Sequence, residues 1–187
     1  MLESLYKECR TKMTKSVEII RHEMASIRTG RASTALLDGI KVNYYGNPTP
    51  LKQVANITVP EARLMVIQPW ETKMLPVIEK AILASSLGLT PVNDGQVIRL
   101  PIPPMSEERR KELLRLVNKI AEDGRVSIRN VRREFNEQIK KLEKEGTLSK
   151  DLAADALDEI QKITDEHIEK IDEIYQLKEK EIMEDQF

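Results

Sequence analysis

Basic side chains gather on one side of a helix predicted between residues 106 and 145. At about 100° per residue, seven of them fall within a sector of about 100°, in which Glu122 is the one acidic residue between Lys111 and Lys140. This basic sector consists of Lys111, Arg115, Arg125, Arg129, Arg132, Arg133 and Lys140. A rigid basic array without an aromatic of its own suits a phosphate backbone better than splayed bases. We therefore predict that its members other than Lys140 bind RNA; the alternative is an ordinary solvated face of a bundle helix.

No catalytic motif accompanies this sector. The sequence contains no P-loop, GxGxxG, HExxH or GxSxG pattern and no Cys/His cluster. Cys9 is the only cysteine, which excludes an internal disulfide and a zinc ribbon, and it is expected to be a small buried hydrophobe. We therefore expect no enzymatic activity, no cofactor and no metal site.

Three further features have residue types that can bind a partner. Trp70 follows Pro69 at the start of a helix, which favours a packing anchor over a stacking platform. The hairpin at Tyr44–Pro48 is either a contact surface or an ordinary turn. His167 is predicted to lie on the flank of a core stripe, away from any partner that would make it a ligand.

The composition points to a helical protein with an uneven charge distribution. Charged residues make up 33% of the chain and aromatic residues only 4%, which fits long, surface-rich helices. Residues 106–148 contain 12 Lys and Arg against 9 Asp and Glu, whereas residues 149–187 contain 5 against 13. An RNA partner would thus meet one face and not the whole molecule. Since the chain shows no signal-peptide core and no 18-residue apolar run, we expect a soluble cytoplasmic protein.

Three segments show the period of amphipathic helices. Residues 3–28 carry an apolar stripe from Leu5 to Ile27 in steps of three or four. The stripe of residues 106–145 runs through Leu116 or Val117 to Leu142, with one double step across Gly124. A third stripe starts at Leu152 and continues to about residue 185. Because one helix cannot bury its stripe alone, the three must pack together.

The block between the first two helices has a different period. Strands are predicted at residues 40–45, 53–59, 63–68 and 97–100, with a helix at 72–87 that Gly88 closes. Residues 46–50 carry Gly, Asn and Pro and are predicted to be a turn. The resulting fold class is α+β, an elongated three-helix bundle of residues 1–30 and 105–187 with an inserted β/α/β domain of residues 31–104.

Two connections join these predicted domains and are expected to act as a hinge. Gly30 gives the outgoing connection backbone angles that are closed to other residues. The return connection is stiff because each proline fixes φ. The hinge residues are Thr29, Gly30, Arg31, Pro101, Pro103 and Pro104.

Many short motifs, in order along the whole chain, resemble the ribosome recycling factor family. They are residues 27–33 (IRTGRAS), 36–40 (LLDGI), 44–46 (YYG), 48–51 (PTPL), 79–82 (EKAI), 87–89 (LGL), 98–99 (IR), 103–104 (PP), 107–111 (EERRK) and 129–133 (RNVRR). The C-terminal Phe187 also fits the family, whereas Thr34 stands where the family often has proline.

The resemblance implies a non-catalytic factor. Its members are L-shaped, similar to tRNA in outline, and bind between the ribosomal subunits after termination. With elongation factor G and GTP they split the ribosome and release mRNA and tRNA. The resemblance implies that the bundle touches large-subunit ribosomal RNA, with Arg129 and Arg132 matching the family's arginines, and that the chain is a monomer. A helical RNA-binding or RNA-chaperone adapter without a ribosome role is the alternative, and an enzyme comes third.

Overall fold

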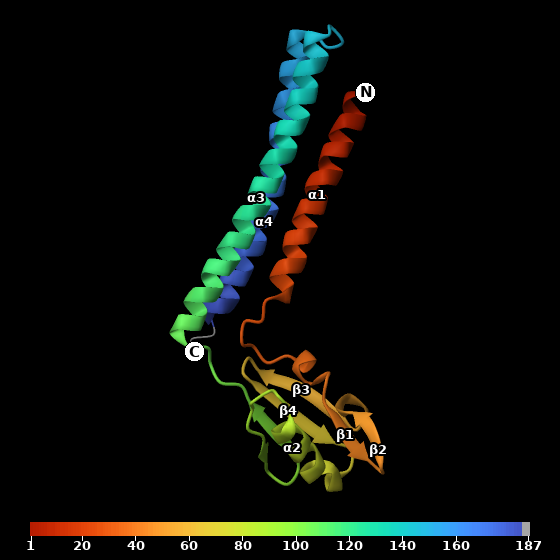
Figure 1. Cartoon of the computed structure of the whole chain (residues 1–187), viewed down its shortest axis with the longest axis vertical. Coiled ribbons are helices and arrows are strands. Elements are labelled where there is room, and N and C mark those ends of the chain that lie inside the picture. Colours follow the sequence, from red (N-terminus) through yellow and green to blue (C-terminus); the bar gives the residue numbers. More distant parts are fainter. Residues whose placement is uncertain (185–187) are drawn as a thin grey trace. The chain divides into compact units, whose positions relative to one another are not determined.

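The computed structural model describes residues 1–184, which divide into two compact units. The bundle unit comprises residues 1–28 and 107–184, and the small unit comprises residues 29–106. Figure 1 shows three long helices in the first and strands with short helices in the second. The predicted α+β class is confirmed. Phe187, part of the resemblance, lies outside the described residues.

The bundle unit consists of α1 (Leu2–Ser26), α3 (Glu107–Lys144) and α4 (Lys150–Glu184), each packed against the other two. Polar contacts fix their directions. Lys12 binds Glu134 at 2.6 Å and Ser16 contacts Ser127 at 3.0 Å, so α1 and α3 are antiparallel. Arg132 of α3 contacts Gln161 of α4, and these two helices are also antiparallel, with a short connection at Gly146.

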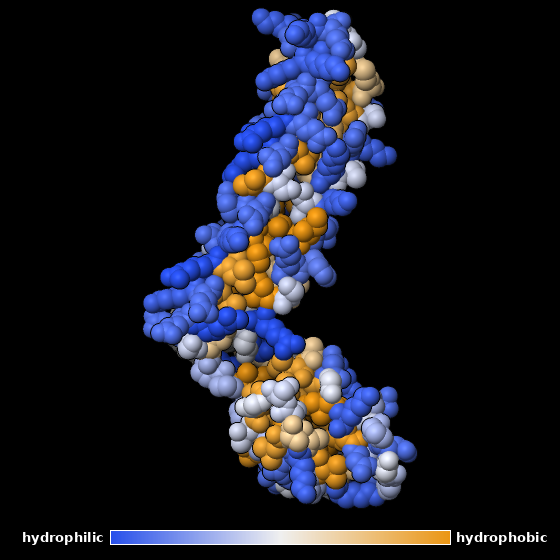
Figure 2. Space-filling view, viewed as in Figure 1, coloured by the Kyte–Doolittle hydropathy of each residue, from blue (hydrophilic) through white to orange (hydrophobic). Residues whose placement is uncertain are grey.

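The apolar stripes form the core of this unit. The predicted stripe of α1 is buried from Leu5 to Met24, and Cys9 within it is fully buried, which raises the pKa of its thiol to about 11. On α3 the inward residue is Val117, and Leu116 is exposed. Figure 2 shows hydrophilic residues over most of the visible face of the bundle, with hydrophobic residues mainly between α1 and α3. Burial of these stripes holds the three helices together.

Two positions on α4 differ from the prediction. Leu152 is exposed, and its neighbour Ala153 lies in the core instead. His167 was placed on a flank but is only 3% exposed. Its Nδ1 lies 2.7 Å from the carbonyl oxygen of Ile163 and its Nε2 lies 3.2 Å from the hydroxyl of Thr14. A buried imidazole is tolerated there because both ring nitrogens have hydrogen-bonding partners.

The small unit is built on antiparallel strands. Its elements are η1 (Thr34–Leu37), β1 (Lys41–Tyr44), β2 (Asn47–Pro50), η2 (Leu51–Gln53), β3 (Ala55–Glu61), β4 (Leu64–Pro69), η3 (Thr72–Met74), α2 (Leu75–Ala84), β5 (Val92–Asn93) and β6 (Ile98–Pro101). Strands β1 and β2 form a hairpin, and the other four form a sheet in the order β3-β4-β6-β5. Ile67 of β4, Ile98 of β6 and Ile78 of α2 belong to one buried cluster, which is the core of this unit.

The strand prediction missed β2 and β5 and extended the helix too far. Residues 47–50 are not merely a turn but pair with β1, where Pro48 and Pro50 are tolerated because a two-stranded hairpin leaves β2 at an edge. Helix α2 ends at Ala84, before Gly88. Trp70 is 69% exposed, so the prediction that it is a packing anchor is wrong. Its backbone N–H donates to the carbonyl of Val54, but its ring lies outside the core.

Candidate nucleic-acid interface

The basic sector follows the side of α3 that faces α4 and solvent. Arg125 and Arg132 reach side chains of α4, whereas Glu134 and Ser127 on the other flank contact α1. The whole sector belongs to one continuous helix of 38 residues, so its members keep a fixed spacing over the roughly 44 Å from Lys111 to Lys140. A straight row of cations on a rigid element can follow a phosphate backbone.

Arg125 is the most enclosed member of the sector. Its side chain is 18% exposed. Nε and Nη2 each lie 2.8 Å from Oδ1 of Asp172 on α4, and the guanidinium carbon lies 5.9 Å from the ring centre of Tyr175. Nη1 donates to Glu122 at 3.1 Å. Arg125 thus joins α3 to α4 and offers one edge of its guanidinium outward, which separates it from the more exposed arginines.

Arg129 shares Glu122 with Arg125. Its Nη1 donates to Oε1 of Glu122 at 3.1 Å, and its side chain is 37% exposed. Hydrogen bonds from Arg129 and then Arg125 lower the pKa of the Glu122 carboxyl from its ordinary value. The one acid of the sector is therefore an ion-pair partner of two of its arginines and is charged at neutral pH.

Arg132 lies at the boundary with α4. Its Nη1 donates to Oε1 of Gln161 at 3.3 Å, and the amide of Gln161 donates to Asp165 at 2.8 Å. Among the described residues, Nε of Arg132 and Oδ1 of Asn136 are buried without a hydrogen-bonding partner. The charge pattern does not point to Asn136 or Gln161. Asn136 lies four residues from Arg132 on the same side of the helix, which is a local signal, but nothing local points to Gln161.

The outer members of the sector project into solvent. Arg133 donates to Asn130 at 3.3 Å, and Lys111 pairs with Glu107 at 3.4 Å one turn away. Arg115 and Lys140 are exposed and make no ion pair with any residue from 1 to 184. Since arginine forks match phosphate oxygens in pairs, the sector can bind an anionic backbone along most of its length.

The described residues form neither of two other kinds of feature, a metal site and a membrane-spanning helix. Within residues 1–184 no three metal-ligating side chains lie close enough together to hold an ion. No helix in the same range is long and apolar enough to cross a bilayer.

The predicted connections can be placed within the small unit. Gly30 has φ 81°, a value that favours glycine. The N–H of Ala32 donates to the carbonyl of Ala62 at 2.7 Å, and that of Ile102 donates to the carbonyl of Arg63 at 2.8 Å. Both connections are thus tied to the same turn between β3 and β4.

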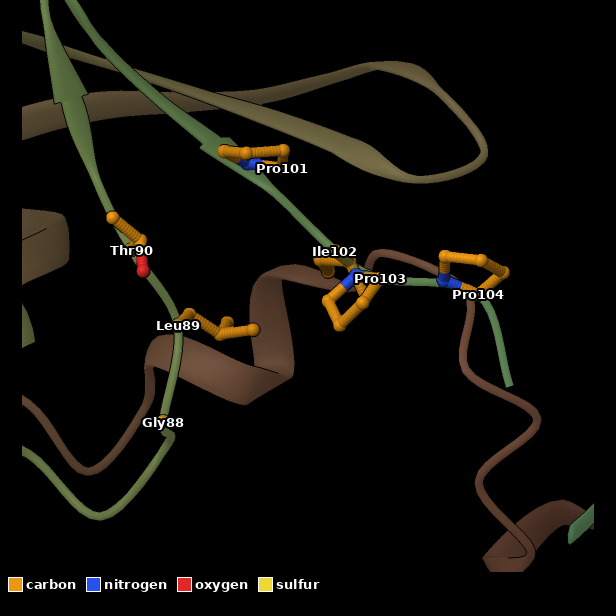
Figure 3. Close-up of a pocket in the computed structure, with 7 residues that line it drawn as sticks. All are labelled: Gly88, Leu89, Thr90, Pro101, Ile102, Pro103 and Pro104. Carbon is orange, nitrogen blue, oxygen red and sulfur yellow. The ribbon is translucent and has the colours of Figure 1, made fainter. Parts of the chain in front are cut away.

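Pro101 was predicted to belong to the return connection, but it lies in β6. It is the last residue of β6 and lies opposite Leu64 of β4. A proline is tolerated there because β5 pairs only with Arg99 and Ile98, so the other side of Pro101 has no neighbouring strand. Pro101 and the three residues that follow it line a shallow pocket of about 420 Å³ with Gly88, Leu89 and Thr90 (Figure 3). The lining of this pocket has no charged side chain, so it does not extend the candidate nucleic-acid interface.

The hairpin at Tyr44–Pro48 holds its tyrosines by internal contacts. The hydroxyls of Tyr44 and Tyr45 each donate to Glu71 at 3.0 Å, and Lys73 lies 4.4 Å from the ring centre of Tyr45. Tyr45 is 65% exposed and has φ 50°. These contacts tie the hairpin to the segment after β4. Because they involve one acidic and one basic side chain, Glu71 and Lys73, they create no positively charged surface for a phosphate.

Comparison with known proteins matches residues 20–183 to the family model described as ribosome recycling factor. The ribosome-recycling factor of Desulfatibacillum aliphaticivorans is 52% identical over 184 residues, which covers 98% of this chain and 100% of the relative. That of Geobacillus kaustophilus is 54% identical over the same shares of the two chains.

Two solved structures are similar over nearly the whole chain. A solution structure of the ribosome recycling factor has 49% sequence identity and a TM-score of 0.64, covering 98% of this chain and 97% of its own. The other, at 51% identity and a TM-score of 0.59, covers 97% of this chain and 98% of its own. It represents the T. thermophilus ribosome recycling factor and the E. coli elongation factor G bound to the E. coli post-termination complex.

Proposed function

The chain belongs to the ribosome recycling factor family, and we propose that it binds the post-termination ribosome and, with elongation factor G and GTP, separates the subunits. This releases mRNA and tRNA. The similar structure with elongation factor G on a post-termination complex supports this pair of partners. The chain acts without a catalytic step or cofactor of its own, because GTP hydrolysis falls to elongation factor G. It acts as a monomer in the cytoplasm, where ribosomes work.

We further propose that the basic sector of α3 binds RNA of the large subunit. The observation that carries this proposal is the alignment of Arg125, Arg129 and Arg132 along one flank of a single helix, each with at least one guanidinium edge at the surface. The backbone is the target because phosphates accept from such forks in pairs. Arg129 and Arg133 are more exposed than Arg125, which is held by α4.

Two experiments separate this function from an adapter that binds RNA without splitting ribosomes. Co-sedimentation with isolated large subunits in moderate salt measures the binding. A splitting assay with elongation factor G and GTP, followed by light scattering, measures the activity. We expect both to be positive, and binding without splitting would favour the adapter.

We expect Arg132→Ala to weaken binding to the large subunit. The substitution removes a charge-assisted hydrogen bond to phosphate, which should cost about 1.5–3 kcal/mol of binding free energy. The dissociation constant is measured by co-sedimentation, and a melting curve checks the fold because the Arg132 side chain is partly enclosed.

Lys141→Ala is the matched control. It also removes one positive charge from α3, but Lys141 lies outside the basic sector and pairs with Glu145 at 4.0 Å. Its affinity should stay within about twofold of the original, as expected for an exposed pair. Equal affinities of the Arg132→Ala protein and the unchanged protein, with equal melting curves, would remove Arg132 from the interface.

We also expect binding to weaken steeply with salt. If about four members of the sector contact phosphates, log affinity should fall with a slope of roughly −3 to −4 against log salt concentration. The slope is measured by repeating the co-sedimentation over a range of potassium concentrations. A flat response would mean that contacts with ribosomal proteins dominate, contrary to the proposal.

We propose, finally, that the two connections form a hinge between the units. Gly30 supplies the flexible side, since its φ of 81° lies where few other residues are stable. Pro103 and Pro104 make the return side stiff. Elongation factor G could then move the small unit while the bundle stays on RNA. Because Pro101 lies in β6, the return side of this hinge begins after it.

A further inference from the structure

The space between Arg125 and Arg129 holds an anionic group that belongs to the chain itself. Oε2 of Glu122 accepts from Nη1 of Arg125 and its Oε1 accepts from Nη1 of Arg129, both at 3.1 Å. Two guanidinium groups on either side of one anion is also the arrangement with which arginines bind a phosphate. At about 100° per residue, Glu122 lies within the basic sector, where a backbone that follows the sector would pass.

The orientation of Arg125 does not depend on Glu122. Its inner edge is held by Asp172 through two contacts of 2.8 Å, and Tyr175 lies 5.9 Å from the guanidinium. Nη1 would therefore keep its outward direction if the Glu122 carboxylate left. Glu122 has a side chain that is 51% exposed, so its carboxylate can rotate into solvent without crossing the core.

We propose that the position of the Glu122 carboxylate is a binding site for an RNA backbone phosphate, which the carboxylate fills in the unbound protein and leaves when RNA binds. The inference rests on the proposed RNA-binding function of α3 and adds a defined phosphate position to it. Binding must break two ion pairs and return a charged carboxylate to water, which limits the affinity. Glu122 thus lets the factor dissociate after each round of recycling.

Glu122→Gln tests this site because it keeps the size of the side chain and removes its charge. With full-length protein and isolated large subunits, we expect the affinity to rise about three- to thirtyfold, the range of two exposed ion pairs that no longer have to break. The gain should appear mainly as slower dissociation. Asp123→Asn is the matched control, since it removes the same charge one residue away and outside the sector, and should change affinity by less than about twofold.

A double-mutant cycle with Arg129→Ala locates the effect. The gain from Glu122→Gln should shrink in the Arg129→Ala protein, because one of the two arginines that form the site is gone. A Glu122→Gln protein that binds equally or more weakly would overturn the proposal and make Glu122 a residue that positions Arg129. Equal gains from Glu122→Gln and Asp123→Asn would also overturn it, because net charge alone would explain both.

The cycle also separates this inference from the function on which it rests. If Arg129→Ala and Arg132→Ala both leave binding unchanged, the RNA-binding assignment of α3 fails. If they weaken binding while Glu122→Gln does not strengthen it, only the phosphate site fails.

Discussion

Gly124→Leu should destabilise the bundle unit by about 3 kcal/mol, the upper end of the usual cost of overpacking. Gly124 lies where the three helices meet. A Cβ at this position would lie 2.6 Å from Cγ1 of Ile20 on α1 and 3.0 Å from Cδ1 of Ile171 on α4. Denaturant unfolding followed by circular dichroism measures the loss. Because the sheet belongs to the other unit, the loss of stability should appear in the helical part of the circular dichroism signal.

The partner of Gly124 can be identified by a second cycle. Alanine gains about 1 kcal/mol of helix propensity over glycine, so Gly124→Ala should cost less than the leucine variant. Ile20→Ala alone should cost about 2–5 kcal/mol, but less when Gly124→Ala is present, because the new methyl group fills part of the space. Strictly additive costs, or a Gly124→Leu protein as stable as the original, would show that the helices are not closely packed at Gly124.

Gly30→Pro should slow ribosome splitting by about tenfold, which corresponds to about 1.4 kcal/mol in the activation barrier. Proline fixes φ near −65°, whereas Gly30 has φ 81°. The variant must therefore use a different and more restricted connection. Affinity for the large subunit should stay within about twofold, since α3 is untouched. The splitting rate and the affinity are measured on the same protein.

Thr34→Pro is a suitable control for the effect of adding a proline. Thr34 is the first residue of η1, where proline is compatible with the backbone, and the preceding Ser33 is already extended with φ −141° and ψ 137°. This variant should split ribosomes at the original rate. Normal splitting by a well-folded Gly30→Pro protein would exclude the hinge from the mechanism.

The positions that the sequence predicted well are those controlled by a local period. The stripe of α1 is buried as expected, because an α-helix brings every third or fourth residue to one side whatever it packs against. The same geometry places the basic sector on one flank of α3. The local period does not determine which of two adjacent apolar residues is buried. Val117 is buried instead of Leu116, and Ala153 instead of Leu152, because the partner helices decide which edge of a stripe is covered.

The small unit shows where local chemistry is insufficient. Asn47–Pro50 has the composition of a turn, yet it pairs with β1 because an edge position needs few donors from it. Pro101 belongs to β6 for a similar reason. Trp70 is a residue type that is usually buried, but after β4 its ring is exposed. The partner strand decides the outcome for Asn47–Pro50 and for Pro101; β1 is one turn away along the chain, whereas Leu64 of β4 is distant in sequence from Pro101.

By itself, the sequence determined the helices, the α+β class and the row of cations on α3, since all three follow from residue type and backbone period. Only the tertiary structure decided what each cation can do. Arg125 is held by Asp172, which lies 47 residues away on α4, and Arg129 shares Glu122 with it. His167 is buried because Thr14 of α1 meets it. Hydrogen bonds between helices depend on which surfaces come together, and a period within one helix does not contain that information.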